Sequence, residues 1–430
     1  MVSDASQKRR LQRFCEASLI TGPSSDGISS GSGGRTVEGL FARQAFTGFG
    51  PLALLPDVDP PPLHIIKARR LGRLRALVRR DCRRLPGVYG MIDAKGELIY
   101  VGKAKDLRVR LLSYFRRRSR DPKAGRILKR TRQLVWEIAA SEFAALLREL
   151  ELIQRWQPRF NVQGQPGRRR RVYVCVGRRP AATVFLAKEP PRTASVSFGP
   201  VPGGFMACEA VRRLNDWFRL RDCAQSQKMT FADQPELFSL PLTPGCIRHE
   251  IGNCLGPCAA ACTRDDYAVS VQALVAFLRG DDDSPLRILE REMTAASANL
   301  AFERAAALRD KLASLTWLSE RLRLVREASR HSFVYPVRGH EDAESWYLIH
   351  GGRVCAVVPA PKDETSRREV ARRVRKVYER PSSASVPPSP REIDGVLLVA
   401  AWFRRRKEER LNILKPPAAL EQATLSDFPA

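Results

Sequence analysis

Two short apolar runs separated by a polar turn form the most regular pattern in the chain. The runs are 87–91 and 97–101, and the turn between them reads Asp93-Ala94-Lys95-Gly96. Apolar runs of this length around a glycine-containing turn are typical of a β-hairpin. Each predicted strand carries one tyrosine, Tyr89 in the first and Tyr100 in the second.

Leucines at helical spacing follow the hairpin and predict a helix. The apolar positions on one side of it are Leu107, Leu111 and Leu112. Asp106 is the expected N-cap, and the helix is predicted to run through Phe115. Arg110 and Tyr114 are four residues apart, so both project from one face, close to the turn that presents Lys103.

A second helix is predicted to begin after Ser141 and to run to about Trp156. Its apolar stripe is formed by Phe143, Leu146, Leu147, Leu150 and Ile153. Glu149 falls inside or at the margin of that stripe. A carboxylate there is costly to bury unless a cation compensates it. A salt bridge is the ordinary explanation, and a bound metal ion is the alternative.

Two tyrosines, two cations and one carboxylate are therefore expected around a single hairpin. Taken singly, a strand tyrosine is usually a packing residue, and an Arg/Tyr pair on a helix is usually a solvated face. Hydrolysis of a phosphodiester needs a base that activates water, a divalent cation on the scissile phosphate and an arginine for the charge of the transition state. The combination favours a phosphodiesterase site.

The same residues resemble a known family. The tripeptides Gly87-Val88-Tyr89 and Tyr100-Val101-Gly102 stand where the GIY-YIG nucleases carry their signature. The fuller string, from Leu85 through Pro158-Arg159-Phe160-Asn161, resembles the N-terminal nuclease domain of the UvrC family, the incision subunits of bacterial nucleotide excision repair. The match depends on the whole string rather than on one tripeptide.

The resemblance implies a catalytic role for most of the residues already singled out. Tyr100 would be the general base. Tyr89 and Lys103 would assist it. Arg110 would stabilise the charge of the transition state, and Tyr114 would orient the phosphate or the water.

Two further roles follow from the resemblance. Glu149 would be the single protein ligand of Mg²⁺ or Mn²⁺. Asn161 would fix the site from the end of the domain. None of the seven positions departs from the family pattern, which argues against a decayed enzyme.

Composition agrees with a nucleic-acid partner. The 430 residues include 74 Lys and Arg against 46 Asp and Glu, a net charge of +28, which favours a polyanionic partner. Half of the residues in 67–84 are basic, in a predicted surface helix that would also contact phosphates. No apolar run is long enough to span a bilayer, so a cytoplasmic protein without a membrane partner is expected.

Cysteines mark the middle of the chain. Cys246, Cys254 and Cys258 follow the spacing C-x7-C-x3-C, and Cys223 precedes them. Four thiolates in a cytosolic protein favour a metal site over disulfides, and the spacing is not that of a zinc ribbon. The resemblance implies a 4Fe-4S cluster; zinc and no metal remain open. The reserve ligands are Cys262 and His249.

Residues 286–318 are predicted to form a helical hairpin with two apolar stripes. The segment 300–310 resembles the UVR motif, through which UvrC and UvrB pair. The resemblance implies UvrB as a partner, with Phe302 as the anchor. The further contact residues would be Ala305, Leu308 and Arg309. The alternative is an ordinary intramolecular pair of helices.

The C-terminal third is less informative. A second hairpin is predicted around Gly351-Gly352, followed by a basic helix over 368–379, a Ser/Pro linker over 381–390 and a last helix from Ile393 to about Leu414. UvrC proteins continue here into an RNase-H-like nuclease and helix-hairpin-helix modules. Both are expected to be missing, as in the shorter homologue Cho.

The whole pattern predicts an α+β chain. The fold would comprise a small GIY-YIG domain with an antiparallel sheet flanked by helices, a cysteine-containing middle region, an α-helical UVR hairpin and a small C-terminal α/β tail. The expected divisions are a disordered segment (1–62), a basic helix (63–84), the GIY-YIG domain (85–165), the middle region (166–265), the helical hairpin (266–328) and the C-terminal hairpin and helices (329–430).

The predicted function is one metal-dependent incision 3′ to a lesion in double-stranded DNA. The resemblance implies that UvrB, loaded on the damaged strand by UvrA, recruits the chain. Two alternatives remain: a non-catalytic adaptor that binds UvrB or DNA, and a structure-specific nuclease that needs no UvrB.

Overall fold

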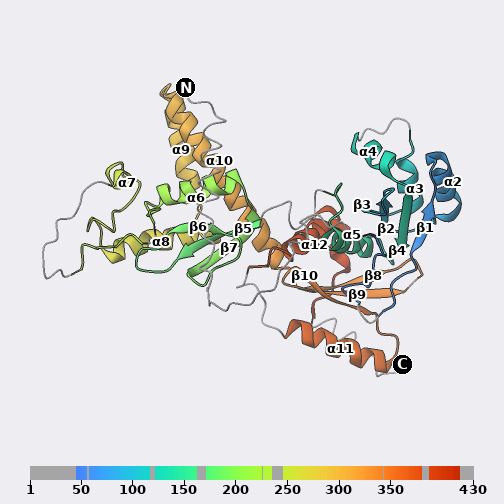
Figure 1. Ribbon diagram of the computed structural model, residues 1–430. Helices are drawn as coiled ribbons and strands as arrows, with labels where there is room; N and C mark the ends of the chain where they lie inside the picture. The colour runs from blue at the N-terminus through green and yellow to red at the C-terminus, as the bar shows by residue number, and fades with distance from the viewer. Residues whose placement is uncertain are drawn as a thin grey trace, which may run out of the picture. The chain divides into compact units, whose positions relative to one another are not determined.

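The computed structural model describes residues 45–55, 58–116, 122–161, 171–224, 226–234, 246–341, 343–379 and 387–416. The chain divides into two compact units (Figure 1). We call Gly27–Arg168, Ala328–Ala384 and Asp394–Ala430 the tyrosine unit, and Met1–Asp26, Arg169–Glu327 and Ser385–Ile393 the cysteine unit. No described helix has the length and apolar character needed to cross a bilayer.

A four-stranded antiparallel sheet lies at the centre of the tyrosine unit. Its strands are β1 (His64–Lys67), β2 (Gly87–Ile92), β3 (Leu98–Ala104) and β4 (Gln133–Ile138), in the order β1-β4-β2-β3. The predicted hairpin is confirmed: β2 pairs with β3, with Tyr89 opposite Gly102 and Met91 opposite Tyr100. β3 extends to Ala104, so Lys103 belongs to the strand and not to a turn.

Helices flank this sheet and confirm the α+β class. They are α2 (Leu71–Asp81), α3 (Leu107–Ser113), α4 (Pro122–Arg130) and α5 (Glu142–Trp156). Both predicted N-caps are present, because Asp106 accepts from the Val109 amide and Ser141 from the Ala144 amide. The first helix ends at Ser113 rather than at Phe115, with Tyr114 as its C-cap.

The N-terminal part of the tyrosine unit differs from the expectation of disorder up to Pro62. Residues 45–55 pack against α5: Phe49 is 2 % exposed, and the ring of Phe46 lies 5.2 Å from that of Trp156. Arg148 of α5 donates to the carbonyl of Pro51 (2.9 Å). Burial of two aromatic rings outweighs a composition rich in Gly and Pro. Residues 1–44 of the predicted segment lie outside the described part.

The C-terminal part of the tyrosine unit is a second antiparallel sheet with two helices. The strands are β8 (Phe333–Arg338), β9 (Glu344–His350) and β10 (Arg353–Pro359), and the helices are α11 (Glu364–Tyr378) and α12 (Ile393–Arg405). The predicted hairpin around Gly351-Gly352 is the β9–β10 pair. The last helix ends at Arg405, because Leu414 pairs with Val334 as a β-bridge instead. Residues 380–386 of the predicted linker lie outside the described part.

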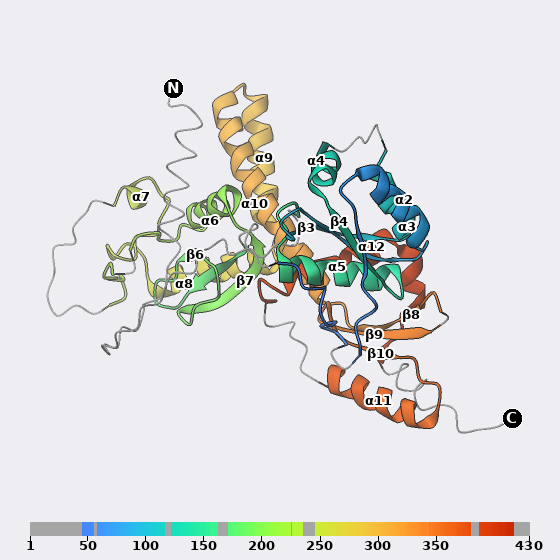
Figure 2. The same cartoon turned by 45° about the vertical axis from the view of Figure 1, so that its right-hand side comes forward.

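α5 lies between the two sheets of the tyrosine unit (Figures 1 and 2). Its residues Ala145, Leu152 and Ile153 pack with the first sheet. Its residues Phe143, Leu146 and Leu147 pack with the C-terminal sheet and α12. The broad apolar stripe of the sequence thus serves two packing faces.

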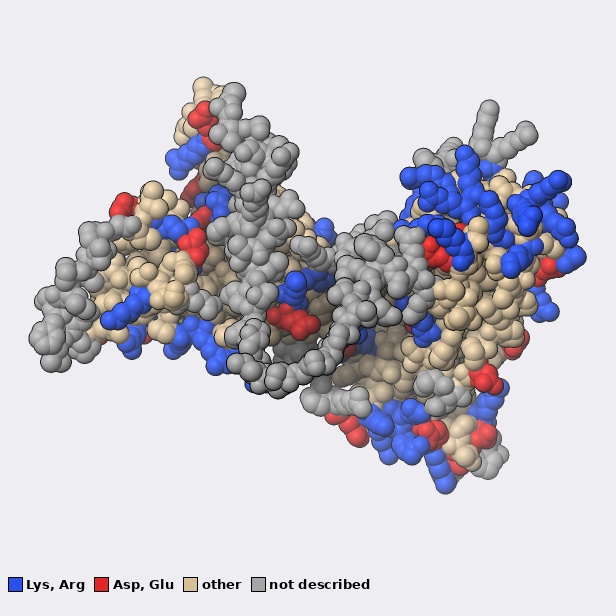
Figure 3. Space-filling model, viewed as in Figure 1, with Lys and Arg blue, Asp and Glu red and all other residues tan. Residues whose placement is uncertain are grey.

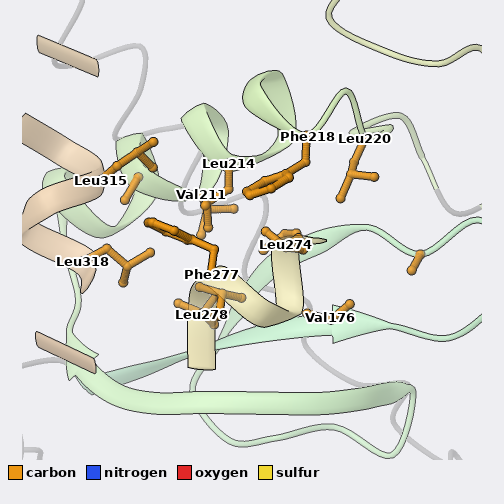
Figure 4. Packing of buried hydrophobic residues seen from close by; sticks show 14 of the residues in the cluster. Val176, Val211, Leu214, Phe218, Leu220, Leu274, Phe277, Leu278, Leu315 and Leu318 are labelled. Atoms are coloured by element: carbon orange, nitrogen blue, oxygen red, sulfur yellow. The ribbon is translucent and has the colours of Figure 1, made fainter. Parts of the chain in front are cut away.

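The cysteine unit has one core (Figure 4). It contains the sheet β5 (Arg171–Gly177), β6 (Val184–Ala187) and β7 (Ala194–Pro202), and the helices α6 (Phe205–Trp217), α7 (Ile247–Glu250), α8 (Arg264–Arg279), α9 (Ser284–Ala298) and α10 (Phe302–Ser329). The helical hairpin α9–α10 is confirmed. Its Leu315 and Leu318 join Phe277 of α8, a helix not predicted from the sequence, in this core.

Candidate active site

Three tyrosines meet in the tyrosine unit, from β2, β3 and the end of α3. The ring centroids are 6.2 Å apart for Tyr89 and Tyr100, 6.0 Å for Tyr89 and Tyr114, and 6.4 Å for Tyr100 and Tyr114. The hydroxyls of Tyr89 and Tyr114 share a hydrogen bond of 2.8 Å. The structure therefore joins residues that the sequence had placed on three separate elements. We call these three residues the tyrosine cluster.

Gly102 explains why one signature tripeptide ends in glycine. It faces Tyr89 across the β2–β3 pair. A Cβ atom at Gly102 would lie 2.5 Å from the Tyr89 hydroxyl, far inside van der Waals contact. The ring of Tyr89 therefore occupies the space that any other side chain would need.

Arg110 adds a cation to the tyrosine cluster. Its Nε donates to the Tyr89 hydroxyl (3.2 Å), and its guanidinium lies 5.2 Å from the ring centroid of Tyr114. Burial raises the pKa of Tyr89 and of Tyr100, and Arg110 opposes both shifts. Both tyrosines are protonated at neutral pH, with a positive charge beside them that favours deprotonation.

Glu149 of α5 lies close to this cluster. Its Oε1 accepts a hydrogen bond from the Lys103 amide (3.0 Å). Burial raises the pKa of Glu149, opposed by the Lys103 amide and by the charges of Lys103 and Arg110. Within the described residues no hydrogen bond to its Oε2 is found. A buried carboxylate with an open oxygen is suited to a hard divalent cation.

Lys103 has a partner that was not predicted from the sequence. Its Nζ donates to Glu142 Oε1 (2.7 Å), and Arg406 Nη2 donates to Glu142 Oε2 (2.6 Å). Glu142 lies seven residues before Glu149, a spacing that puts both on one face of α5 and could have identified it. No local sequence signal could have identified Arg406.

Asn161 acts on the backbone of β3. Its side-chain oxygen accepts from the Val101 amide (2.9 Å) and its side-chain nitrogen donates to the Val101 carbonyl (2.8 Å). Val101 stands between Tyr100 and Gly102. Asn161 is thus placed to fix the strand rather than to reach the cluster.

The four predicted cluster cysteines lie in the loops of the cysteine unit. Cys254 is buried, Cys246 and Cys258 are half-buried, and Cys223 is exposed. Burial raises the pKa of Cys258, and the charges of Cys223 and Cys246 raise it further, so these thiols are near neighbours. In the described parts of the chain, however, no three His, Cys, Asp or Glu side chains converge on a position for one metal ion.

The two reserve ligands are less suited to a metal. Burial raises the pKa of Cys262 to about 11. The Nδ1 of His249 lies 3.2 Å from the carbonyl of Cys254.

The tip of the helical hairpin is the most exposed apolar part of the cysteine unit. Phe302 is 63 % exposed, and Arg309 is exposed and paired with Asp310 (2.9 Å). Leu308, by contrast, is 8 % exposed and belongs to the core, with Ala305 packed against it. Leu308 is therefore a core residue, and the prediction of a partner contact there is wrong.

Comparison with known families places these units in one class. Residues 85–162 match the UvrC-like GIY-YIG domain, residues 172–277 the middle domain of the UvrC/Cho excinucleases, and residues 283–315 the UvrB/UvrC motif. Together with the relatives below, these matches show that the chain is a UvrC-like protein with a GIY-YIG domain.

Among its relatives is the UvrABC system protein C of Desulforudis audaxviator, 32 % identical over 352 residues, which cover 77 % of this chain and 53 % of the relative. That of Dechloromonas aromatica is 33 % identical over 237 residues, 55 % of this chain and 37 % of the relative. The chain thus spans about half or less of these relatives. The magnesium-bound GIY-YIG N-terminal endonuclease domain of Thermotoga maritima UvrC is 32 % identical, covering 22 % of this chain and all of that domain, with a TM-score of 0.20.

Proposed function

We propose that the chain is a metal-dependent DNA endonuclease of nucleotide excision repair, which makes one incision 3′ to a lesion. The observation that carries the proposal is the hydrogen-bonded tyrosine cluster with Arg110 and the buried carboxylate of Glu149 beside it. Isolated features of this kind are common in protein cores. A buried arginine, a carboxylate with an open oxygen and tyrosine hydroxyls together meet the needs of phosphodiester hydrolysis.

Tyr100 would take the proton of the attacking water at its hydroxyl oxygen. Because burial raises the pKa of Tyr100, the phenolate needs positive charge nearby, and Arg110 already acts in that direction. Tyr114 would orient the phosphate or the water, since Tyr89 fixes its hydroxyl through the 2.8 Å hydrogen bond.

Glu149 would hold Mg²⁺ or Mn²⁺. A bound divalent cation would supply charge stabilisation at the scissile phosphate. Mg²⁺ usually takes one or two carboxylates and fills its other positions with water and substrate phosphate. A site with a single carboxylate agrees with this preference.

Double-stranded DNA would bind over α2 and α4. Lys and Arg side chains gather on this part of the tyrosine unit (Figure 3). The exposed basic residues of the two helices include Arg73, Arg75, Arg79, Arg126, Lys129 and Arg130. Contacts of this kind go to phosphates and make binding steeply dependent on salt. Replacing Arg126 and Arg130 by Met should reduce the slope of binding against salt by about one unit per lost phosphate contact.

UvrB would dock at the tip of the helical hairpin, where Leu300 and Phe302 are 72 % and 63 % exposed. Replacing Phe302 by Ala should weaken UvrB binding without unfolding the hairpin, because Leu308 and Leu315 hold it to the core. Incision that is unchanged by this substitution would favour the nuclease that needs no UvrB.

A 4Fe-4S cluster would be held by Cys223, Cys246, Cys254 and Cys258. A cluster spreads its ligands over several iron atoms, so its cysteines stand further apart than the ligands of one zinc ion. Neighbouring thiols that do not converge on one point fit that spacing better. A brown anaerobic preparation is expected; a colourless protein with stoichiometric zinc would contradict the cluster.

The incision itself is testable with an end-labelled duplex that carries one bulky adduct, incubated with UvrA, UvrB, ATP and Mg²⁺. The expected product is one nick 3′ to the adduct that disappears without UvrB or after chelation of the metal. The non-catalytic adaptor predicts UvrB binding without a nick, and the same repair phenotype after loss of Arg110.

A further inference from the structure

The C-terminal part of the tyrosine unit grips the N-terminus of α5. The His340 amide donates to the Ala140 carbonyl (3.1 Å). The ring of Phe143 lies 5.1 Å from Tyr335, 4.9 Å from Tyr347 and 5.2 Å from Trp402. Edge-on aromatic contacts of this kind add to the burial of the rings themselves. The start of α5 is thus packed between sequence segments almost two hundred residues apart.

Glu142, between those two anchored positions, is shared by two cations. Its oxygens accept from Lys103 Nζ (2.7 Å) and Arg406 Nη2 (2.6 Å). Burial alone would raise the pKa of Glu142, but Lys103 and Arg406 together hold it below its usual value. The carboxylate is therefore ionised at neutral pH, with each oxygen committed to a different partner.

Arg406 is itself held in place. Its guanidinium lies 4.3 Å from the ring centroid of Trp402, a cation–π contact. The indole of Trp402 in turn donates to the Tyr335 hydroxyl (3.3 Å). Since Tyr335 and Trp402 also contact Phe143, the same aromatic group orients both the helix and the arginine.

Lys103 is held by α5 at two points. Its amide bonds to Glu149 (3.0 Å) and its ammonium to Glu142 (2.7 Å). With Arg406 present, only one oxygen of Glu142 is available to the ammonium. Without Arg406, Glu142 could rotate and bind Lys103 through either oxygen.

We propose that Glu142 and Arg406 are positioning residues, through which the C-terminal part of the tyrosine unit sets the direction of the Lys103 ammonium at the nuclease site. The proposal rests on the proposed endonuclease function. Neither residue is expected to touch the DNA phosphate that is cut. Their effect passes through Lys103 and depends on the fixed geometry of one shared carboxylate.

The test replaces Arg406 by Met in the full chain and measures incision in the assay above. The matched control is Arg404→Met, which removes an exposed arginine from the same helix. We expect Arg406→Met to lower kcat about 10-fold with KM for the DNA little changed, since geometry and not binding is lost. Arg404→Met should leave kcat at the wild-type value, and Arg406→Lys should restore a large part of the loss.

A double-mutant cycle separates positioning from general damage. In a Lys103→Met background, Arg406→Met should cause no further loss of kcat. The same 10-fold loss in both backgrounds, or no loss in either, would overturn the proposal. Should Arg406→Met lower Tm by more than about 4 °C, beyond the effect of one exposed pair, Glu142→Gln removes the link from its other end and should reproduce the loss of kcat.

A readout without catalysis separates this proposal from the nuclease itself. After reductive ¹³C-methylation, the NMR signal of Lys103, assigned with Lys103→Arg, should shift in Arg406→Met and stay in place in Arg404→Met. An unmoved signal contradicts the positioning role even if the wild type cuts DNA. A moved signal in a protein that does not cut would leave the contact intact and disprove the endonuclease instead.

Discussion

The tyrosine site and the cysteine site of this chain are built in opposite ways. The tyrosine site is carried by strands and helices, and direct contacts join its parts: Tyr89 to Tyr114, Arg110 to Tyr89, Glu149 to the Lys103 amide. The four cysteines lie in loops around α7, a helix of four residues, and do not converge on one point within the described chain. A site on regular elements is formed before its ligand binds, whereas a site on loops depends on the ligand for its final geometry.

Arg110→Met should give the largest effect on the tyrosine site. Loss of one donor to developing charge typically costs about 10²–10³ in kcat. Single-turnover incision measures it. Lys105→Met, which removes an exposed cation two residues beyond Lys103, is the control and should cut at a near-wild-type rate. Equal losses in both variants would mean that Arg110 contributes only to general attraction of DNA.

Gly102→Ala tests whether the site is as tightly packed as the contacts imply. The new Cβ would overlap the Tyr89 hydroxyl, so we expect a loss of about 1–3 kcal/mol in the free energy of unfolding, measured with urea, together with loss of incision. Gly125→Ala in α4 meets no atom within 4 Å and should be neutral or slightly stabilising. A stable, active Gly102→Ala protein would show that the hairpin yields easily.

Cys254→Ser should affect the cysteine unit alone. We expect loss of visible absorbance and faster hydrogen exchange in the loops around α7, with unchanged protection in β2, β3 and α5. Cys355→Ser, at an exposed position of the tyrosine unit, should keep the absorbance. Faster exchange in β2 and β3 after Cys254→Ser would contradict the independence of the two sites.

Tyr114→Phe removes one hydroxyl and leaves the packing of the ring. Because the Tyr89 hydroxyl then keeps only Arg110 as a partner, a loss of about 1 kcal/mol in stability is expected. Thermal or urea unfolding would detect it. An unchanged stability would indicate that water replaces the lost hydroxyl.

Glu149→Gln should produce the smallest effect, on the pH dependence of stability without metal. Burial raises the pKa of Glu149 in the folded state. The stability associated with its protonated form is therefore complete below the unfolded-state pKa and is lost as pH rises through the folded-state pKa. The variant should be the more stable protein at neutral pH, with a difference that shrinks in acid. A difference that grows in acid would contradict this sign.

The sequence predicted the local parts of the tyrosine site. The hairpin and the caps Asp106 and Ser141 depend on residues close together in the chain, and the resemblance of 85–161 supplied the candidate residues. The pair Glu142–Arg406 joins positions 264 residues apart, so no local pattern could reveal it.

Two other features escaped prediction for physical reasons. Residues 45–55 have a loop-like composition, and only the partners of Phe46 and Phe49 explain their order. Leu308 belongs to an apolar stripe that serves both a docking hairpin and an intramolecular core, and periodicity does not distinguish these. The structure assigns it to the core.

The central claim is that the Glu149 carboxylate and the tyrosine cluster form a metal-dependent phosphodiesterase site. The most direct test compares incision by the wild type, Glu149→Ala and Glu151→Gln in Mg²⁺. Glu151 lies on the same helix and pairs with Arg148 and Arg155 instead. The account predicts one UvrB-dependent nick from the wild type and Glu151→Gln, and none from Glu149→Ala. A wild-type rate from Glu149→Ala would contradict it.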